Sequence, residues 1–283
     1  MAEVEGGVFK PRPEHLFPVI LSLAITGILG IPFAISGVEV ASVTPFEGDT
    51  YSGASLNAAF FVIALAASAT AMFLLVRRGK MGFLRKMIKA ALIMVSFSVV
   101  FWYNDILFLL LGSPIGEPAA STLLLAVSLG VGLGLGLLVF AGDRTRQLIG
   151  VALVSGFTGL FLGASIPLLT ALILAGALVV YDVVAVFRGP VGALAKSLEV
   201  GDLPGAVFTY RELTIGMGDM VFYSLVATTA LLNYGVLSFL ATGAGILSGS
   251  FLGFKALQKF EMFPGLPFSL ILGVAGMLLV AWL

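Results

Sequence analysis

The chain contains no cysteine and a single histidine, His15, among its 283 residues. The absence of cysteine excludes disulfides, thiolate nucleophiles and cysteine-ligated metals, and it leaves the redox compartment undefined. One histidine cannot form the paired-histidine zinc site of a metalloprotease or, from the polar N-terminal tail, a serine-histidine pair inside the apolar segments. A serine-lysine pair is disfavoured because every lysine lies in a polar connector. Aspartate and glutamate remain for acid-base chemistry, and we expect no metal and no organic cofactor.

Charge is also scarce. Charged residues make up 11% of the chain, hydrophobic residues make up 59%, and the mean hydropathy is +1.13. A soluble domain has about 25% charged and about 45–50% apolar residues. The formal net charge is zero, and no concentrated basic patch of the kind that binds nucleic acid is present, so that class is excluded. The composition predicts a polytopic membrane protein whose surroundings are the lipid bilayer.

Long apolar runs divide the chain. A helix needs about 20 apolar residues to cross the hydrocarbon core, and nine such runs lie between charged or turn-rich breaks. We predict an all-α, polytopic fold over a single membrane-embedded domain, 1–283, with 188–214 as the longest connector and a short amphipathic turn over Val191–Glu199. The first run is longer than the core of a signal peptide, so we expect a retained helix although Ala34-Ile35-Ser36 is an admissible cleavage site. The predicted helices cover residues 16–36, 55–76, 88–111, 119–141, 148–165, 167–187, 215–233, 236–254 and 264–283.

Lysine and arginine collect in alternate connectors. All 15 lie in the N-terminal tail or next to the breaks that follow the second, fourth, sixth and eighth runs. The remaining connectors and the C-terminal end carry none, and they hold Glu39, Glu47, Asp49 and Glu117 instead. Because lysine and arginine accumulate on the cytoplasmic side, this alternation predicts a cytosolic N-terminus and supports the nine-helix count independently.

Three aspartates lie within apolar runs: Asp105, Asp182 and Asp219. An ionised aspartate inside a bilayer span costs at least about 2.5–3.5 kcal/mol, so each is a candidate for function. Asp105 ends the aromatic and polar cluster Trp102-Tyr103-Asn104-Asp105, for which we expect an internal hydrogen bond or a water contact. Asp182 precedes Arg188 by six residues and so lies roughly 9 Å deep. Asp219 lies four residues into the next run, which starts from the same face, so these two acids are predicted to meet.

Two neighbouring carboxyl groups in a poorly solvated place divide one proton between them. One can then take a proton from water while the other donates a proton to a carbonyl oxygen, which is what amide hydrolysis requires. The residues therefore predict a catalytic pair, Asp182 and Asp219, that hydrolyses peptide bonds within the membrane, without showing which is the base. The alternative is a proton-coupled secondary transporter that uses the same pair as a relay. Transporters usually show broken helices in two repeated halves, whereas the breaks here lie in the last third.

Two short segments interrupt the regular helix pattern near these acids. Gly216-Met217-Gly218 precedes Asp219, and glycine at both positions permits a close backbone approach by an extended peptide. Pro264-Gly265-Leu266-Pro267 begins the last run, and its prolines leave backbone groups that a substrate strand could pair with. Each segment is also explained by a simpler role, as a flexible helix start or as a turn at the membrane interface.

Together these segments resemble the presenilin and signal-peptide-peptidase family of intramembrane aspartyl proteases. The family has Tyr-Asp in its sixth helix, Gly-x-Gly-Asp in its seventh and Pro-Ala-Leu at its ninth. The matching segments here are Val180-Tyr181-Asp182-Val183, Ile215-Gly216-Met217-Gly218-Asp219 and Pro264-Gly265-Leu266-Pro267.

The resemblance implies a presenilin-like endopeptidase that cleaves a transmembrane helix of a membrane-protein substrate. It implies that Asp182 and Asp219 are catalytic. Tyr181, Gly216, Met217 and Gly218 would support the site, and the segment 264–267 would dock the substrate.

The sequence departs from the family pattern in two places. Gly265 stands where the family has alanine, a change of one small residue for another, and the connector 188–214 is much shorter than the large loop of animal presenilins. With its compact connectors and a cytosolic N-terminus, the chain looks like an archaeal presenilin homologue, which implies the plasma membrane of a prokaryote. The sequence leaves natural substrates and self-association into a homo-oligomer open.

Overall fold

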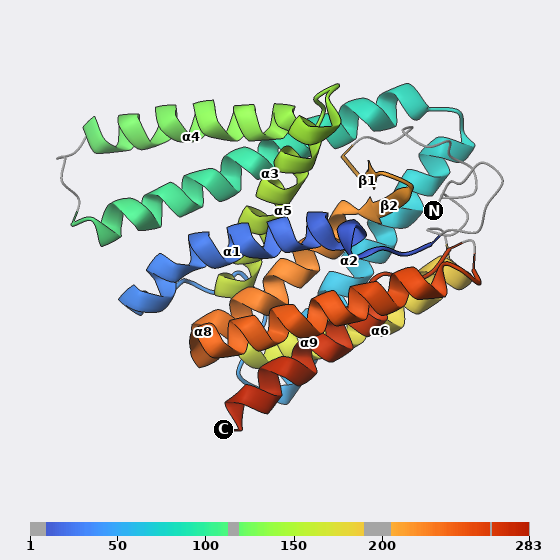
Figure 1. Cartoon of the computed structure of the whole chain (residues 1–283). Helices are drawn as coiled ribbons and strands as arrows, with labels where there is room; N and C mark the ends of the chain where they lie inside the picture. Colours follow the sequence, from blue (N-terminus) through green and yellow to red (C-terminus); the bar gives the residue numbers. More distant parts are fainter. Residues whose placement is uncertain (1–9, 113–118, 190–204, 261, 283) are drawn as a thin grey trace.

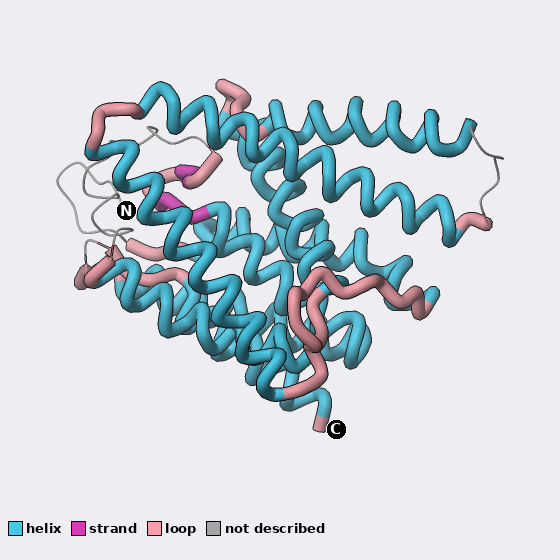
Figure 2. The backbone as a smooth tube through the Cα atoms, turned by 180° about the vertical axis from the view of Figure 1, so that it is seen from behind, coloured by secondary structure: helices cyan, strands magenta, loops and turns pink. Residues whose placement is uncertain are grey.

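The structure, a computed structural model, describes residues 10–112, 119–189, 205–260 and 262–282. These residues form a helical bundle with one small β-hairpin (Figure 1, Figure 2). The elements are the 3-10 helix η1 (Pro13–Leu16), α1 (Phe17–Ser36), α2 (Tyr51–Arg77), α3 (Met81–Leu110), α4 (Ala119–Leu138), α5 (Arg144–Ser165), α6 (Leu168–Phe187), β1 (Val207–Tyr210), β2 (Leu213–Gly216), α8 (Met217–Ala256) and α9 (Leu266–Ala281).

Seven helices in the described part of the chain, α1 to α6 and α8, are long and apolar enough to cross a membrane. The helix α9 is apolar but shorter, with 16 residues. Large apolar side chains are exposed on several of these helices, for example Ile28 on α1, Ile63 on α2 and Leu125 on α4, as lipid contact requires. The chain is therefore an integral, multi-pass membrane protein.

The helices lie in layers around α5. Figure 1 shows α3 and α4 together along one side of the bundle and α6, α8 and α9 along the other, with α1 and α5 between them. The helix α5 is the most buried span, and it contacts α1, α3, α4 and α8. Glycine permits this close packing, because a Cβ on Gly159 of α5 would lie only 2.2 Å from the Cβ of Ser224 on α8. The position of α8, which carries Asp219, is therefore set by direct contact with the centre of the bundle.

The 40-residue α8 consists of two arms that reverse at Gly235. This glycine has φ 81° and ψ −173°, a backbone conformation that is open essentially only to glycine. The contacts with α1 give the direction of each arm. From the start to the end of α1, the residue numbers of its partners rise on the first arm and fall on the second arm. The pairs are Ser22 with Ser224 and Gly30 with Leu231 on the first arm, and Leu23 with Gly243 and Gly27 with Phe239 on the second. The arms, residues 217–234 and 236–256, are therefore antiparallel, and they occupy the places of the two separate helices predicted over 215–233 and 236–254.

Several helices begin earlier than the apolar runs predict. The helix α2 begins at Tyr51 instead of residue 55, α3 at Met81 instead of 88, and α5 at Arg144 instead of 148. The Thr50 hydroxyl accepts the Gly53 N–H at 3.1 Å, and the Asp143 carboxylate accepts the Arg146 N–H at 3.0 Å, so capping residues mark two of these starts. Apolar length measures only the part of a helix that lies in oil, and the polar first turns extend beyond it.

The end of the predicted connector 188–214 forms a β-hairpin. Strands β1 and β2 pair antiparallel, with Val207 opposite Gly216 and Tyr210 opposite Leu213. The prediction that a helix begins at residue 215 is wrong, because Ile215 and Gly216 belong to β2. The turn over Val191–Glu199 lies outside the described residues. Because β2 leads into α8 without a loop, the hairpin sets the direction from which α8 starts.

Candidate active site

Asp219 is the third residue of α8, which follows β2 directly. The residue before the helix, Gly216, is extended, with φ −69° and ψ 131°, and the Met217 N–H donates to the Ala206 carbonyl oxygen at 3.1 Å. This bond holds the first turn of α8 against the start of the hairpin. The Asp219 side chain is half-buried and lines a cavity.

Asp182 reaches the start of α9 from the last turns of α6. Its Oδ2 accepts the Leu266 N–H at 2.9 Å. Leu266 is the first residue of α9, and the N–H groups of a first helical turn have no partner within their own helix. The Asp182 carboxylate therefore satisfies the beginning of α9 and holds it to α6.

Asp219 lies against the residue just before Leu266. A Cβ added to Gly265 would lie 2.3 Å from Asp219 Oδ2, closer than any side-chain atom tolerates. The two carboxyl groups thus converge on the adjacent residues Gly265 and Leu266. The bundle brings together two acids that are 37 positions apart in the sequence.

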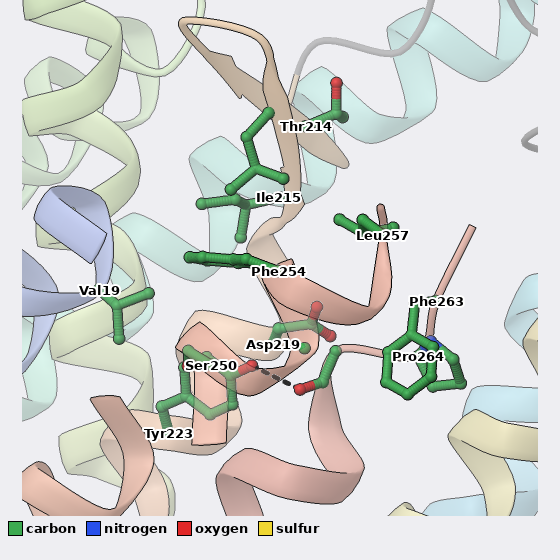
Figure 3. A pocket seen from close by; sticks show the side chains of 13 residues that line it. Val19, Thr214, Ile215, Asp219, Tyr223, Ser250, Phe254, Leu257, Phe263 and Pro264 are labelled. Atoms are coloured by element: carbon green, nitrogen blue, oxygen red, sulfur yellow. Dashed lines mark hydrogen bonds between the residues drawn. The ribbon is translucent and has the colours of Figure 1, made fainter. Parts of the chain in front are cut away.

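The cavity beside Asp219 has a volume of about 70 Å³, which is room for a small number of water molecules. Figure 3 shows Asp219 and Tyr223 pointing toward the segment that carries Phe263 and Pro264. Asp182 is not among the residues that line the cavity. The lining residues come from α1, β2, both arms of α8 and the segment before α9. They are Val19, Leu213, Thr214, Ile215, Asp219, Tyr223, Ser250, Gly253, Phe254, Leu257, Phe263, Pro264 and Gly265.

Tyr223 holds the Gly265 carbonyl, a role that the sequence analysis did not assign. The Tyr223 hydroxyl donates to Gly265 O at 2.9 Å, and the Ser269 hydroxyl donates to the same oxygen at 3.1 Å. Ser250 on the second arm of α8 is hydrogen bonded to Ser269 at 3.0 Å. Tyr223 follows Asp219 by four positions, so both side chains lie on the same face of a helix, and that spacing was the available signal.

The other predicted site residues lie close by in different settings. Gly216 lies next to the Asp219 carboxyl group, whereas Met217 is buried in the apolar core and Gly218 is exposed beside open space. Tyr181 is half-buried beside Asp182 on α6. Pro264 is buried in the cavity wall, and Pro267 is half-buried as the second residue of α9.

In the cluster Trp102-Tyr103-Asn104-Asp105, the internal contacts are made by Tyr103 and Asn104. The Asn104 side chain donates to the Ser128 hydroxyl on α4 at 3.0 Å, and the Tyr103 ring packs on Phe157 of α5. Asp105 itself is exposed, five residues before the end of α3. The predicted internal hydrogen bond is therefore made by Asn104, and Asp105 does not line the cavity beside Asp219.

The helix arrangement matches solved structures of one class, the presenilin family of intramembrane aspartate proteases. One such structure, in space group C222, aligns with a TM-score of 0.63 at 20% identity, over 94% of this chain and 96% of that chain. A second, in space group P2, aligns with a TM-score of 0.64 at 20% identity, over 98% of this chain and 99% of that chain. No protein-family model and no curated protein sequence matches the chain. The chain has the presenilin-family fold, as its sequence predicted.

Proposed function

We propose that this protein is an intramembrane aspartyl endopeptidase that hydrolyses peptide bonds within transmembrane helices, with Asp182 and Asp219 as its catalytic pair. The observation that carries the proposal is the convergence of both carboxyl groups on Gly265 and Leu266, beside a cavity of water-sized volume inside an apolar bundle. The shared fold supports it, because the two similar structures are themselves intramembrane aspartate proteases.

The reaction needs one ionised and one protonated aspartate. The ionised carboxylate takes a proton from water as the water oxygen bonds to the scissile carbonyl carbon, and the protonated carboxyl group donates its proton to the carbonyl oxygen. The tetrahedral intermediate then collapses. The carboxyl group that took the proton from water donates it to the nitrogen as the carbon-nitrogen bond breaks, and the other, now ionised, carboxylate takes a hydroxyl proton as the carbonyl re-forms, so that a carboxylic acid and an amine leave. The pair shares its proton, so either aspartate can serve as the base.

Strand β2 offers a place for an unwound substrate. In the described residues, β2 pairs only with β1, so its other edge carries backbone groups without a strand partner. A peptide added along that edge would form main-chain hydrogen bonds while Thr214 and Ile215 line the adjoining cavity. Pro264 and Gly265, the first two residues of the segment 264–267, line the same cavity, which supports the predicted docking role of this segment. A transmembrane helix must unwind to bind in this way, because helical hydrogen bonds occupy its carbonyl groups.

The same proposal includes a membrane placement. With the arms of α8 counted separately and α9 included, the chain would cross a prokaryotic plasma membrane nine times, with its N-terminus in the cytosol. The alternation of lysine and arginine between connectors supports this orientation. The catalytic pair would then lie in the cytosolic half of the membrane.

An aspartyl-protease inhibitor that mimics the tetrahedral intermediate tests the proposal directly. We expect a photoreactive form of it to label the purified protein in detergent, and unlabelled inhibitor to compete. Asp182→Asn and Asp219→Asn should each reduce labelling to background, because the inhibitor hydroxyl binds both carboxyl groups. If labelling were independent of both aspartates, and liposomes containing the protein showed proton-linked solute flux, the transporter alternative would replace the protease.

Gly265→Ala should lower substrate cleavage about tenfold. The added Cβ would lie 2.3 Å from Asp219 Oδ2, so this carboxyl group must move, and a displacement of about 1 Å at a reacting group can cost up to about 100-fold in rate. The matched control is Gly253→Ala, in the same cavity wall, where a Cβ would meet nothing within 4 Å. Initial rates in proteoliposomes measure both. Equal rates for the two variants would show that Asp219 does not need the space that glycine leaves.

A further inference from the structure

The only histidine of the chain is buried at the start of the fold. His15, in η1, is 1% exposed although the sequence around it is polar. Its Nδ1 accepts the Arg12 N–H at 2.9 Å, so neutral His15 carries its proton on Nε2. That nitrogen lies 3.1 Å from Glu212 Oε2 and is the donor of the bond. A buried ring with both nitrogens engaged has a defined orientation, and the orientation points it at the hairpin.

The partner of His15 lies in the turn between β1 and β2. Glu212 is 53% exposed, and the hydrogen bond from His15 lowers the pKa of this carboxyl group. Glu212 is therefore ionised, and accepts the bond, throughout the neutral range. The adjacent Arg211 has φ 55°, a left-handed conformation that non-glycine residues keep only where their surroundings hold them.

Two further contacts tie the same segments together. Glu14 forms an ion pair with Arg211, and the Phe17 ring stacks on Tyr210 with centroids 6.2 Å apart. Figure 1 shows the start of α1 beside β2. Three consecutive residues of the hairpin thus contact residues 14–17, and the buried member of this set is His15.

We propose that His15 is a positioning residue: through Glu212 it fixes the β1–β2 hairpin and thereby sets the places of Thr214, Ile215 and Asp219 in the site. Asp219 lies seven residues after Glu212, with β2 and the first turn of α8 between them and no loop. A hairpin that shifts at its turn must therefore shift β2 and the start of α8. The effect on catalysis rests on the proposed function, because it requires that the reaction uses Asp219. The tie, meaning the restraint that His15 places on the hairpin through Glu212, can be measured without the reaction.

Substitutions at both partners test this role. We expect His15→Ala and Glu212→Ala each to lower kcat for a transmembrane substrate in proteoliposomes about tenfold. The double variant should be no slower than the slower single variant, because both remove the same contact. His15→Gln, which retains a donor toward Glu212, should restore most of kcat. The control is Glu14→Ala, which removes only the exposed ion pair with Arg211 and should change kcat less than twofold.

Hydrogen exchange of the amides in 207–216 provides a readout that does not depend on cleavage. We expect faster exchange in His15→Ala and Glu212→Ala than in wild type and in Glu14→Ala. A wild-type kcat in both alanine variants, or rate effects that multiply in the double variant, would overturn the positioning role. If the wild type cleaves nothing, the proposed function fails, and unchanged exchange in the variants would then overturn the tie separately. Because Glu212 is exposed, its variant carries the test if His15→Ala does not fold.

Discussion

Asp219→Asn is expected to lower cleavage of a reconstituted transmembrane substrate by about 1,000-fold or more, and Asp182→Asn should do the same. Asparagine has the size of aspartate but neither takes a proton from water nor donates one to a carbonyl oxygen, and such proton transfers contribute about 10²- to 10⁴-fold. At position 182 the asparagine carbonyl oxygen can still accept the Leu266 N–H, so the start of α9 remains in place. The loss is therefore one of chemistry, not of fold.

Single-turnover cleavage and thermal unfolding, measured on the same preparations, check this result. Asp105→Asn is the matched control, because it removes a carboxylate from another apolar helix at an exposed position outside the cavity lining, and it should cleave within twofold of wild type. The double variant should be no slower than either single variant, since the two groups act as a unit. Near-normal turnover in either single variant with an intact fold would remove that aspartate from the reaction.

Leu266→Pro is expected to cleave about 10- to 100-fold more slowly than Leu266→Ala. Both substitutions remove the same buried leucine side chain, but only proline also removes the N–H that Asp182 accepts. A hydrogen bond to a charged group contributes about 1.5–3 kcal/mol, which corresponds to this range of rates. Proline is compatible with the first position of a helix. The preceding Gly265 is in the αR region (φ −78°, ψ −35°), which proline disfavours, but its missing Cβ removes one of the two clashes with the ring.

The comparison of these two variants isolates one backbone donor. The unfolding temperature of Leu266→Pro should be lower by a few degrees, because both variants leave the same space in the core and differ by one hydrogen bond, while their cleavage rates should differ tenfold or more. Rates are measured in proteoliposomes with one substrate at several concentrations, so that kcat and KM are obtained independently. If both variants cleaved equally, the bond from Leu266 to Asp182 would be a helix cap without influence on the reaction.

The high cost of charge in a bilayer let the sequence predict a polytopic membrane fold, and it singled out the candidate acids. Two aspartates in apolar runs had few explanations, and the alternation of lysine and arginine placed them at the same end of the bundle. Their meeting at Gly265 and Leu266 follows from helix packing, which periodicity does not describe. The spacing of Asp219 and Tyr223 was readable, but the acceptor of the Tyr223 hydroxyl, the Gly265 carbonyl, lies 42 residues away.

The hairpin was not predicted, because its turn lacks the residue types that usually mark a hairpin. Two-residue hairpin turns favour asparagine, aspartate and glycine, whereas Arg211 and Glu212 occupy this one. The flanking strands do alternate, with Phe208, Leu213 and Ile215 facing the core, but each has only four residues. The contacts of His15 were equally hidden, since nothing in a local pattern links a polar tail to a turn 197 positions later.

The lack of a side chain at Gly265 affects the position of the Asp219 carboxyl group. As a sequence difference it replaces one small residue with another, and it looked neutral. In the fold, the missing methyl group is the space into which Asp219 Oδ2 extends. The Asp219 carboxyl oxygen therefore occupies the volume that a Cβ on residue 265 would need. The two residues are 46 positions apart in the sequence.

The cavity depends on the reversal of α8 at Gly235, although this glycine lies far from the cavity. Asp219 and Phe254 stand on opposite arms of α8 and line the same cavity, and the arms join at the far end of the bundle. Asp219 lies 16 residues from Gly235, which is about 24 Å along the first arm, so one degree of change in the angle between the arms moves Asp219 by about 0.4 Å relative to the second arm. The width of the cavity between the two arms therefore depends on the backbone torsions of a single glycine at the distant end of both arms.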